Sequence, residues 1–267
     1  MTEDSRPGPA VIVMARAPRP GEGLRPEASS RGSARGASSR GSARGASSRG
    51  SARGAQPEGK TRLRDVLSDE ERLRLQEAFL RDAIEVALEA QIGPVHLAYT
   101  PAEAASWAEG EFGGSIVPFP QEGDDLGARM LSALRHVEAR DFSPLLMIGT
   151  DAPLLQPGHL RSALSAVADA DLCLGPSADG GYYLLACRTA QPQLFRDVPW
   201  STNRVLDTTL RLAAESGLRY SLIETLYDID TPADLALLRE ELPALVREPW
   251  FRVPRHTAET LLTLASE

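Results

Sequence analysis

Two acidic motifs, far apart in the sequence, carry side chains that suit a divalent cation. Asp151 directly follows an apolar run in LLMIGTDAP, residues 145–153, where a strand would hold its carboxylate in a fixed place. Asp228 and Asp230 lie two positions apart in YDIDTPADL, residues 227–235, and so on one side of a short predicted strand. Two such carboxylates repel unless a cation lies between them. We expect one of the pair to join Asp151 in binding Mg²⁺ or Mn²⁺, which prefer oxygen ligands and bridge phosphate oxygens.

Helix capping is the alternative role for these aspartates. Asp151 precedes a predicted turn or helix, whose first N–H groups a carboxylate can satisfy. Asp230 and Thr231 likewise precede a predicted helix with Pro232 at its first position. The sequence leaves both roles open, and we expect capping by one of Asp228 and Asp230 even where the other is a ligand.

A Gly- and Pro-rich basic loop follows the first apolar run. With residues 24–59 set aside, the sequence reads ARAPRPGEGKTRL and brings several positive groups next to glycines. Free backbone N–H groups and positive side chains both favour phosphate oxygens, although the spacing is not that of a Walker A motif. Together with the amide in QEGDDLGARM, residues 121–130, the residues expected to bind the nucleotide are Ala15, Arg16, Gly21, Gly23, Lys60, Arg62, Gln121 and Asp151.

Two further segments, together with Gly127 of residues 121–130, have residue types suited to a second substrate. The run GPSADGGYYLLAC, residues 175–187, contains an Asp-Gly-Gly turn, and VPWST, residues 198–202, offers an aromatic face and two hydroxyls. An ordinary hairpin turn and helix capping are the respective alternatives, and the local sequence does not decide between them. The expected substrate-binding residues are Gly127, Asp179, Gly180, Gly181, Tyr182, Trp200, Ser201 and Thr202.

Short apolar runs alternate with amphipathic stretches along the chain, which is typical of an α/β fold. Strands are expected at 10–15, 94–99, 115–119, 144–149, 171–174, 182–186 and 219–223. Helices are expected at 69–90, 126–139, 157–168, 202–216 and 232–240, with Ser68 and Thr231 as N-caps of the first and last. This pattern predicts a Rossmann-like, mostly parallel sheet with helices on both faces and ligands beyond the carboxyl ends of its strands.

Composition narrows the class of protein. A chain of 267 residues, 42% of them hydrophobic, can bury one large core, and we expect a single domain over 1–242 with a helical C-terminal extension over 243–267. The absence of a long apolar stretch or a signal-peptide pattern predicts no membrane span and a cytoplasmic location. A net charge of −8 argues against nucleic acid as a partner.

Cysteine and histidine give no sign of a zinc site or a catalytic triad. Cys173 and Cys187 are not in a CxxC pair, so we expect two reduced, buried thiols. The histidines are spread along the chain without a nearby nucleophile motif, at His96, His136, His159 and His256.

The first loop is interrupted by a low-complexity insertion at 24–59. Residues 28–54 repeat ASSRGSARG in tandem, and such a sequence has no large apolar side chains with which to offset the entropy of ordering. We therefore expect it to be disordered. Its seven arginines against two glutamates leave a second interpretation open, an arm that contacts an acidic partner.

The order of these motifs resembles a known family. ARAPRPGEG…KTRL, QEGDDLGARM, IGTDAP, GPSADGGYYLLAC, VPWST and DIDTPADL occur as in the bacterial glycosyltransferases associated with arsenosugar biosynthesis, which resemble nucleotide-diphospho-sugar transferases of the GT-A fold. The framework is also similar to guanylyltransferases that act on 2-phospholactate or the molybdenum cofactor. The resemblance implies nucleotide phosphates near Arg16, Lys60 and Arg62, a metal at Asp151 with Asp228 or Asp230, and the second substrate near 179–182 and Trp200.

The predicted function is a metal-dependent transfer from an activated nucleotide to a small acceptor. The preferred reaction is transfer of a sugar from a nucleoside diphosphate sugar, and the alternative is nucleotidyl transfer from a nucleoside triphosphate with release of pyrophosphate. Catalysis would depend on neutralising the charge of the departing phosphate, with Lys60, Arg62 and metal-bound Asp151 as the catalytic groups. A third hypothesis is a noncatalytic binding protein with an arginine-rich arm.

Overall fold

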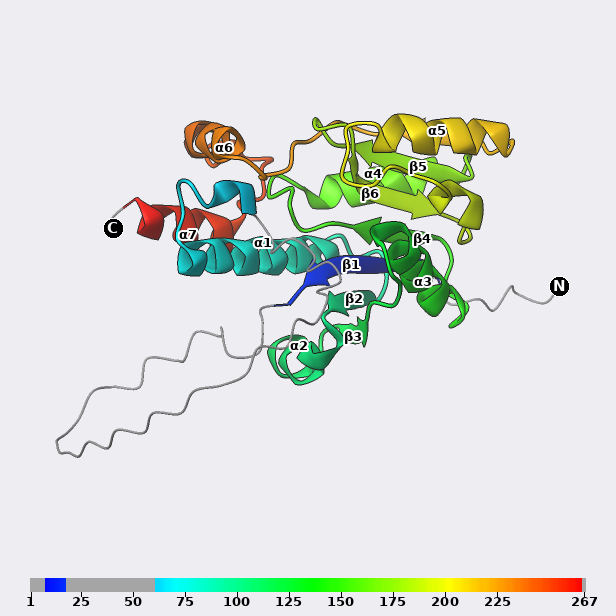
Figure 1. The fold of residues 1–267 in the computed structure, drawn as a ribbon, viewed down its shortest axis with the longest axis horizontal. Coiled ribbons are helices and arrows are strands. Elements are labelled where there is room, and N and C mark those ends of the chain that lie inside the picture. Colours follow the sequence, from blue (N-terminus) through cyan, green and yellow to red (C-terminus); the bar gives the residue numbers. More distant parts are fainter. Residues whose placement is uncertain (1–7, 18–60, 266–267) are drawn as a thin grey trace, which may run out of the picture.

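Seven strands form one sheet in the order β3-β2-β1-β4-β6-β5-β7 in a computed structural model that describes residues 8–17 and 61–265 (Figure 1). The strands are β1 Ala10–Arg16, β2 Val95–Thr100, β3 Val117–Pro120, β4 Leu145–Ile148, β5 Leu172–Pro176, β6 Tyr182–Cys187 and β7 Tyr220–Leu222. Each overlaps an apolar run expected to be a strand. All of them run in the same direction except β6, which is antiparallel to both β4 and β5. The predicted mostly parallel α/β architecture is confirmed.

Several helices begin where the sequence supplies capping groups. Their bounds are α1 Asp69–Glu89, α2 Ala105–Phe112, α3 Leu126–Glu138, α4 Pro157–Ala166, α5 Val205–Glu215, α6 Pro232–Leu245 and α7 Arg255–Leu264, with short 3₁₀ turns η1 Thr61–Leu63, η2 Ala102–Ala104 and η3 Pro192–Phe195. Ser68 and Glu71 form a capping box at α1, and Thr231 and Asp234 form another at α6. Both predicted N-caps are thus confirmed. Helix α5 begins at Val205, three residues later than expected.

Helices cover both faces of the sheet. Because side chains alternate along each strand, each strand contributes apolar side chains to a core on either face. On one face, Val11 and Val13 of β1 pack in a core with residues of α1, α2 and α4. On the other face, Ala10 and Ile12 pack with residues of α3 and α5. The central strands β1 and β4 are buried on both faces, and this holds their carboxyl ends at fixed positions.

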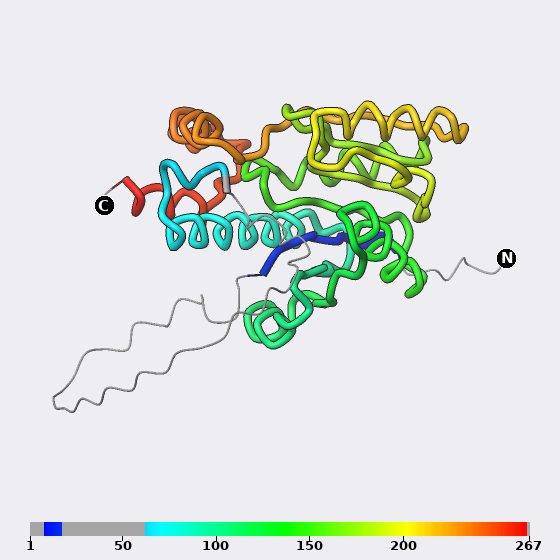
Figure 2. Tube along the Cα trace, viewed as in Figure 1, coloured from blue at the N-terminus to red at the C-terminus, as the bar shows by residue number. Residues whose placement is uncertain are grey.

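A third apolar cluster lies beside the first turns of α1. Leu63 of η1 and Leu75 of α1 pack there with Leu238 of α6 and Leu261 of α7. Figure 2 shows α6 and α7 together next to the start of α1, away from the strand-rich end of the molecule. Helix α6 runs through residue 242, so the division of the chain there stays a prediction.

Several expectations concern individual residues or segments outside the described ranges. Cys173 and Cys187 are free and buried on β5 and β6, as expected, and burial raises the pKa of the Cys173 thiol to about 11. Within 8–17 and 61–265, no helix is long and apolar enough to cross a membrane. The insertion at 24–59 lies outside the described residues, so its expected disorder stays a prediction.

Candidate functional site

A cavity of about 710 Å³ lies over the carboxyl edge of the sheet. Its lining includes the end of β1 at Ala15 and Arg16, and the loop that follows β4, at Gly149 and Asp151. The chain goes from β1 outward to β2 and β3 and then returns to β4 on the other side of β1, so the topology reverses between β1 and β4. Ligands in open α/β sheets bind at such a reversal, and the cavity lies at this predicted position.

Asp151 and Asp228 both line this cavity. The backbone N–H of Ile229 donates a hydrogen bond to the backbone carbonyl of Asp151, with N and O 2.9 Å apart. This bond brings the motif at 227–231 alongside the end of β4. Both Asp151 and Asp228 line the cavity, so two carboxylates from distant parts of the chain face one space.

The expectation of a short strand carrying Asp228 and Asp230 is wrong. Residues 227–230 form no ladder, and the backbone N–H of Ile229 bonds to the loop after β4. The alternation is real, because Ile229 is fully buried and its two neighbours are half-buried. Asp230 does not line the cavity; its N–H donates to Asp234 Oδ2 (3.1 Å) at the start of α6. The cap of α6 is Thr231, and the cap of α4 is Gln156 rather than Asp151.

One side of the cavity, the β1 wall, consists of Ala15, Arg16, Thr100 and Gln121. The Gln121 amide nitrogen donates to the carbonyls of Ala15 (3.0 Å) and Ala98 (2.8 Å), at the ends of β1 and β2. Both amide hydrogens are therefore used, and Oε1 is the atom with which Gln121 can accept a hydrogen bond from a ligand.

The opposite side, the β6 wall, consists of Asp179, Gly181, Tyr182, Trp200, Ser201, Thr202 and Val205. The turn between β5 and β6 is the hairpin that the sequence left open, and it also lines the cavity. Asp179 Oδ1 accepts a hydrogen bond from the Gly181 N–H (2.9 Å), which orients its carboxylate. Ser201 has a φ of 62°, a left-handed conformation that non-glycine residues adopt at a cost and that often marks a binding site.

Two glycines hold the β6 wall together without lining the cavity. A Cβ on Gly180 would lie 2.2 Å from the Asn203 carbonyl oxygen, and the Gly180 carbonyl accepts a hydrogen bond from the Leu206 N–H (2.9 Å). A Cβ on Gly127 would lie 2.6 Å from Trp200 Nε1. Both glycines permit close packing and neither lines the cavity, so their expected role in substrate binding stays a prediction.

The basic loop is described only in part. Arg16 lines the cavity, whereas Arg62 is exposed on η1 and does not line it. Gly21, Gly23 and Lys60 lie outside the described residues, and their roles stay predictions.

The cavity also contains residues that the sequence analysis did not single out. Thr100 and Pro101 follow directly after β2, so the rule that ligands bind just after strands would have identified them. Gln76 projects from within α1 and belongs to no motif, whereas Tyr183 of β6 lies in the run at residues 175–187, of which only the turn and Tyr182 were expected to bind substrate. The Tyr183 hydroxyl donates to the Glu224 carbonyl (2.8 Å), and burial raises its pKa.

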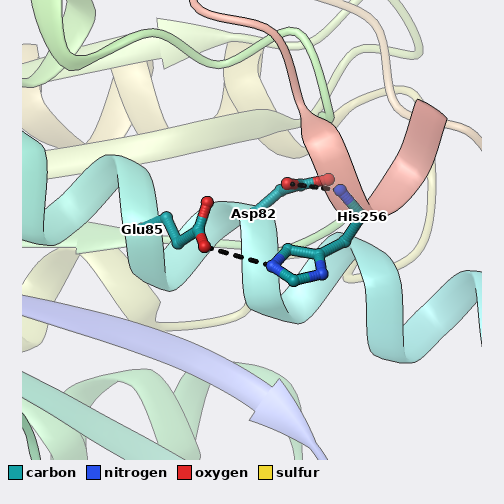
Figure 3. Close-up of side chains that lie close together, drawn as sticks. All are labelled: Asp82, Glu85 and His256. Carbon is teal, nitrogen blue, oxygen red and sulfur yellow. Dashed lines mark hydrogen bonds and ion pairs between the residues drawn. The ribbon is translucent and has the colours of Figure 1, made fainter. Parts of the chain in front are cut away.

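A second group of ionisable side chains, Asp82, Glu85 and His256, lies between α1 and α7 (Figure 3). Its geometry would admit a metal ion, but its acceptor atoms already have partners. The Asp82 carboxylate accepts hydrogen bonds from the backbone N–H (2.8 Å) and hydroxyl (2.7 Å) of Thr257, while Glu85 contacts Arg255 (3.1 Å) and His256 (3.1 Å). Burial raises the Asp82 pKa. We interpret the group as a cap that α1 provides for the N-terminus of α7.

Sequence comparisons identify similar proteins. Residues 83–202 match the family described as "Uncharacterized protein conserved in bacteria (DUF2064)". The chain is 28% identical to a 3-phospho-D-glycerate guanylyltransferase of Phenylobacterium zucineum, over 78% of this chain and 91% of the relative. It is 30% identical to a phosphoenolpyruvate guanylyltransferase of Mycobacterium leprae (67% and 82% covered) and to a 2-phospho-L-lactate guanylyltransferase of Methanocaldococcus fervens (66% and 77%).

Solved structures share the fold. A protein from Desulfovibrio desulfuricans described as a candidate nucleotide-diphospho-sugar transferase superposes with a TM-score of 0.72 at 21% identity, covering 97% of both chains. A nucleotidyl transferase from Methanothermobacter gives a TM-score of 0.50 at 15% identity, covering 87% of this chain and 96% of that one. At these identities the likeness concerns the fold alone. The narrower resemblance to arsenosugar glycosyltransferases stays a prediction.

Proposed function

We propose that this chain, which belongs to the family of the phosphoenolpyruvate and 2-phospho-L-lactate guanylyltransferases, transfers a nucleotidyl group from a nucleoside triphosphate to a small acceptor. The named relatives support a nucleotide-dependent transferase, and they favour nucleotidyl transfer over the sugar transfer that the sequence analysis preferred. The observation that carries the proposal is the pair of carboxylates, Asp151 and Asp228, in one cavity beside Arg16 and Gln121.

The proposed reaction is a displacement at phosphorus. An oxygen of the acceptor forms a bond to the α-phosphorus of the triphosphate, the bond from that phosphorus to the bridging oxygen breaks, and pyrophosphate leaves. Negative charge grows on the leaving group, so positive groups at the β1 wall stabilise the transition state. Arg16 lies at that wall, and we assign the same role to Lys60 on the basis of the sequence resemblance. The resemblance implies it for Arg62 too, but Arg62 is exposed on η1 and does not line the cavity.

The carboxylates of Asp151 and Asp228 fit a divalent cation. They offer only oxygen donors, they face one cavity, and the Ile229 to Asp151 hydrogen bond fixes their backbones relative to one another. Mg²⁺ and Mn²⁺ prefer this donor set and typically take their remaining ligands from phosphates and water. A bound ion would supply neutralisation of the phosphate charge. Asp230 lies at the start of α6 and does not line the cavity, so Asp228 is the proposed partner of Asp151.

Gln121 and the β1 wall are the proposed contacts of the base. Because two backbone carbonyls hold both amide hydrogens, Oε1 must accept a hydrogen bond from the base rather than donate one. Guanine presents N–H donors along its Watson–Crick edge, which suits this acceptor. The preference for GTP rests on this geometry and on the activities named for the relatives.

The test is a comparison of donor nucleotides with the purified full-length chain in Mg²⁺ or Mn²⁺. Each nucleoside triphosphate and a set of nucleoside diphosphate sugars are supplied with a mixed panel of small acceptors. We expect pyrophosphate to appear with GTP and no consumption of sugar nucleotides. Release of a nucleoside diphosphate from a sugar nucleotide, without pyrophosphate from any triphosphate, would show that the proposal is wrong and sugar transfer correct.

A further inference from the structure

The acceptor must bind against the β6 wall if the nucleotide occupies the β1 wall. In the sheet, β4 lies between β1 and β6, and Asp151 follows β4, so we place it between the two walls. The nucleotide phosphates would reach that middle region from the β1 side. The lining also includes Gln76 of α1 and Leu126, Arg129 and Met130 of α3, and the β6 wall is the part that lies beyond Asp151 in the order of the sheet.

The charge of the β6 wall is negative. Among its described residues, Asp179 is the one side chain charged at neutral pH, and the neighbouring Arg204 does not line the cavity. The described cationic residues that line the cavity are Arg16 on β1 and Arg129 on α3. Arg129 Nε donates to the Gly123 carbonyl (3.1 Å), which ties its side chain to the loop that follows the β1-wall residue Gln121.

The wall also presents an aromatic face in a fixed orientation. Trp200 stacks on Phe195 with ring centroids 6.3 Å apart and an interplanar angle of 25°, and Gly127 packs against its indole edge. Asp179 is held by its hydrogen bond to Gly181, which leaves the second carboxylate oxygen to accept from a ligand. An aromatic face beside an oriented carboxylate suits a compound with C–H faces and hydroxyl donors.

The relatives are named for acceptors of a different charge. Phosphoenolpyruvate, 3-phospho-D-glycerate and 2-phospho-L-lactate each carry a phosphate and a carboxylate. Such an anion would lie against the Asp179 carboxylate, while Arg16 and Arg129 lie outside this wall and the cation proposed at Asp151 and Asp228 is shared with the phosphates of the nucleotide. Like-charge contacts of this kind discriminate strongly against a ligand.

We propose that the acceptor of this chain is an uncharged compound with several hydroxyl groups, such as a polyol or a sugar, bound by Asp179 and the face of Trp200. This inference rests on the proposed nucleotidyl transfer. One acceptor hydroxyl oxygen bonds to the α-phosphorus, the bond to the bridging oxygen breaks, pyrophosphate leaves, and the hydroxyl proton passes to solvent. The product is a phosphodiester rather than the diphosphate that a phosphorylated acceptor would give.

The test begins with binding, so that the two proposals fail separately. Titration calorimetry of the full-length chain with GTP and Mg²⁺ establishes whether the nucleotide site works. Pyrophosphate release from GTP is then measured with a panel of polyols and sugars and, in parallel, with the phosphorylated acids named above. We expect at least one neutral acceptor to raise the rate roughly tenfold over the acceptor-free rate, and the phosphorylated acids to leave it unchanged.

Substitutions at Asp179 test whether its charge selects the acceptor. Asp179→Asn keeps an oxygen for the Gly181 N–H. It should lower the apparent affinity for the neutral acceptor roughly tenfold, because the acceptor hydroxyl no longer donates a hydrogen bond to a charged carboxylate. Asp179→Lys should make phosphoenolpyruvate a better ligand, again by roughly tenfold. The matched control is Asp207→Lys, which makes the same charge change on the exposed side of α5 and should behave as the unaltered chain.

Three outcomes are informative. Stimulation of the unaltered chain by a phosphorylated acid, equal to or above that by neutral acceptors, overturns the acceptor assignment and leaves nucleotidyl transfer standing. Intact GTP binding without stimulation by any neutral acceptor also overturns the acceptor assignment. No binding of any nucleoside triphosphate contradicts the proposed function itself.

Discussion

Ile229 donates its backbone N–H to the backbone carbonyl of Asp151 across 2.9 Å, and this bond joins the two acidic motifs of the chain. Ile229 is fully buried in the cluster beside α1, so the pairing is anchored by apolar packing as well as by the hydrogen bond. Its neighbour Asp228 lines the cavity, while Asp230 does not and bonds through its N–H to Asp234 at the start of α6. The two aspartates therefore have different surroundings.

The first prediction separates these two aspartates. Asp228→Asn should reduce metal-dependent pyrophosphate release by at least roughly 10- to 100-fold, the range seen when even outer-shell partners of a metal are lost. Asp230→Asn should change the rate by much less, because Asp230 does not line the cavity. Rates at increasing Mg²⁺ would show whether the Asp228 variant needs more metal. Equal losses in the two variants would contradict this division of roles.

The second prediction concerns the support that Gln121 gives to the sheet edge. Gln121→Glu replaces a double donor by a carboxylate that faces the carbonyls of Ala15 and Ala98. Unmet acceptors should lower the free energy of unfolding by about 1–3 kcal/mol at neutral pH, and nucleotide affinity should fall with it. Urea unfolding and GTP titration measure the two effects. Glu122→Gln, an exposed change at the next position that does not touch the cavity lining, is the control.

The sequence predicts most of the strands of this fold, but not the direction of every strand. The strands were predictable because buried runs such as Leu145–Ile148 are continuously apolar. The direction of β6 was not, because the Asp179 to Gly181 turn fits both a hairpin and a ligand-binding loop, and in the structure it is both. Helix α2, Ala105–Phe112, was missed; it is short, contains Gly110 and buries only Ala108.

The site was predictable where a motif follows a strand. Asp151 and Arg16 follow or end central strands, and both line the cavity. Sequence could not show that residues 227–230 pair with a loop, because alternation of burial around Ile229 looks the same in a strand and in an isolated extended segment. It also could not identify Gln76, which lines the cavity from within α1. The helical spacing of apolar residues in α1 predicts which of its residues are buried in the core, not which of its polar residues line a cavity.

The third prediction concerns the carboxylate that caps α7. Asp82 is buried and accepts hydrogen bonds from Thr257 and from the His256 backbone N–H (3.2 Å). Asp82→Ala should lower the free energy of unfolding by roughly 3–5 kcal/mol, because it leaves buried partners of a charged group unpaired. Chelation of divalent metals should leave the melting temperature of the Asp228→Asn variant, which lacks a ligand of the proposed cavity metal, unchanged. A large drop on chelation in that variant would indicate a structural metal at Asp82, Glu85 and His256.

The fourth prediction is a loss of stability in acid that depends on His96. The imidazole is buried between Phe119 and Phe142, its nitrogens have no hydrogen-bond partner among the described residues, and burial lowers its pKa from 6.5 to about 4, with smaller effects of Arg140 and His136. The unfolded chain binds this proton near pH 6.5 and the folded chain only near pH 4. Stability from this residue is therefore complete above pH 6.5 and falls by about 3 kcal/mol as the pH drops to 4.

His96→Leu should remove that part of the acid sensitivity, because leucine has no proton to bind. Urea unfolding of both proteins at pH 7.5 and at pH 5 measures the difference, and His256→Gln provides a control at a partly exposed histidine. An unchanged difference between the two pH values in the His96 variant would show that other groups cause the acid sensitivity.

The fifth prediction tests the packing that orients the aromatic face. A Cβ at Gly127 would lie 2.6 Å from Trp200 Nε1, closer than atoms can approach, so Gly127→Ala must displace the indole. Overpacking of this kind should cost about 1–3 kcal/mol and shift the tryptophan emission. Gly110→Ala is the control: nothing lies within 4 Å of its added Cβ, and helix propensity should stabilise the chain by up to about 1 kcal/mol. Loss of acceptor stimulation in the Gly127 variant, with GTP binding retained, would tie the position of Trp200 to the acceptor; unchanged emission and stimulation would show that the wall tolerates the extra methyl group.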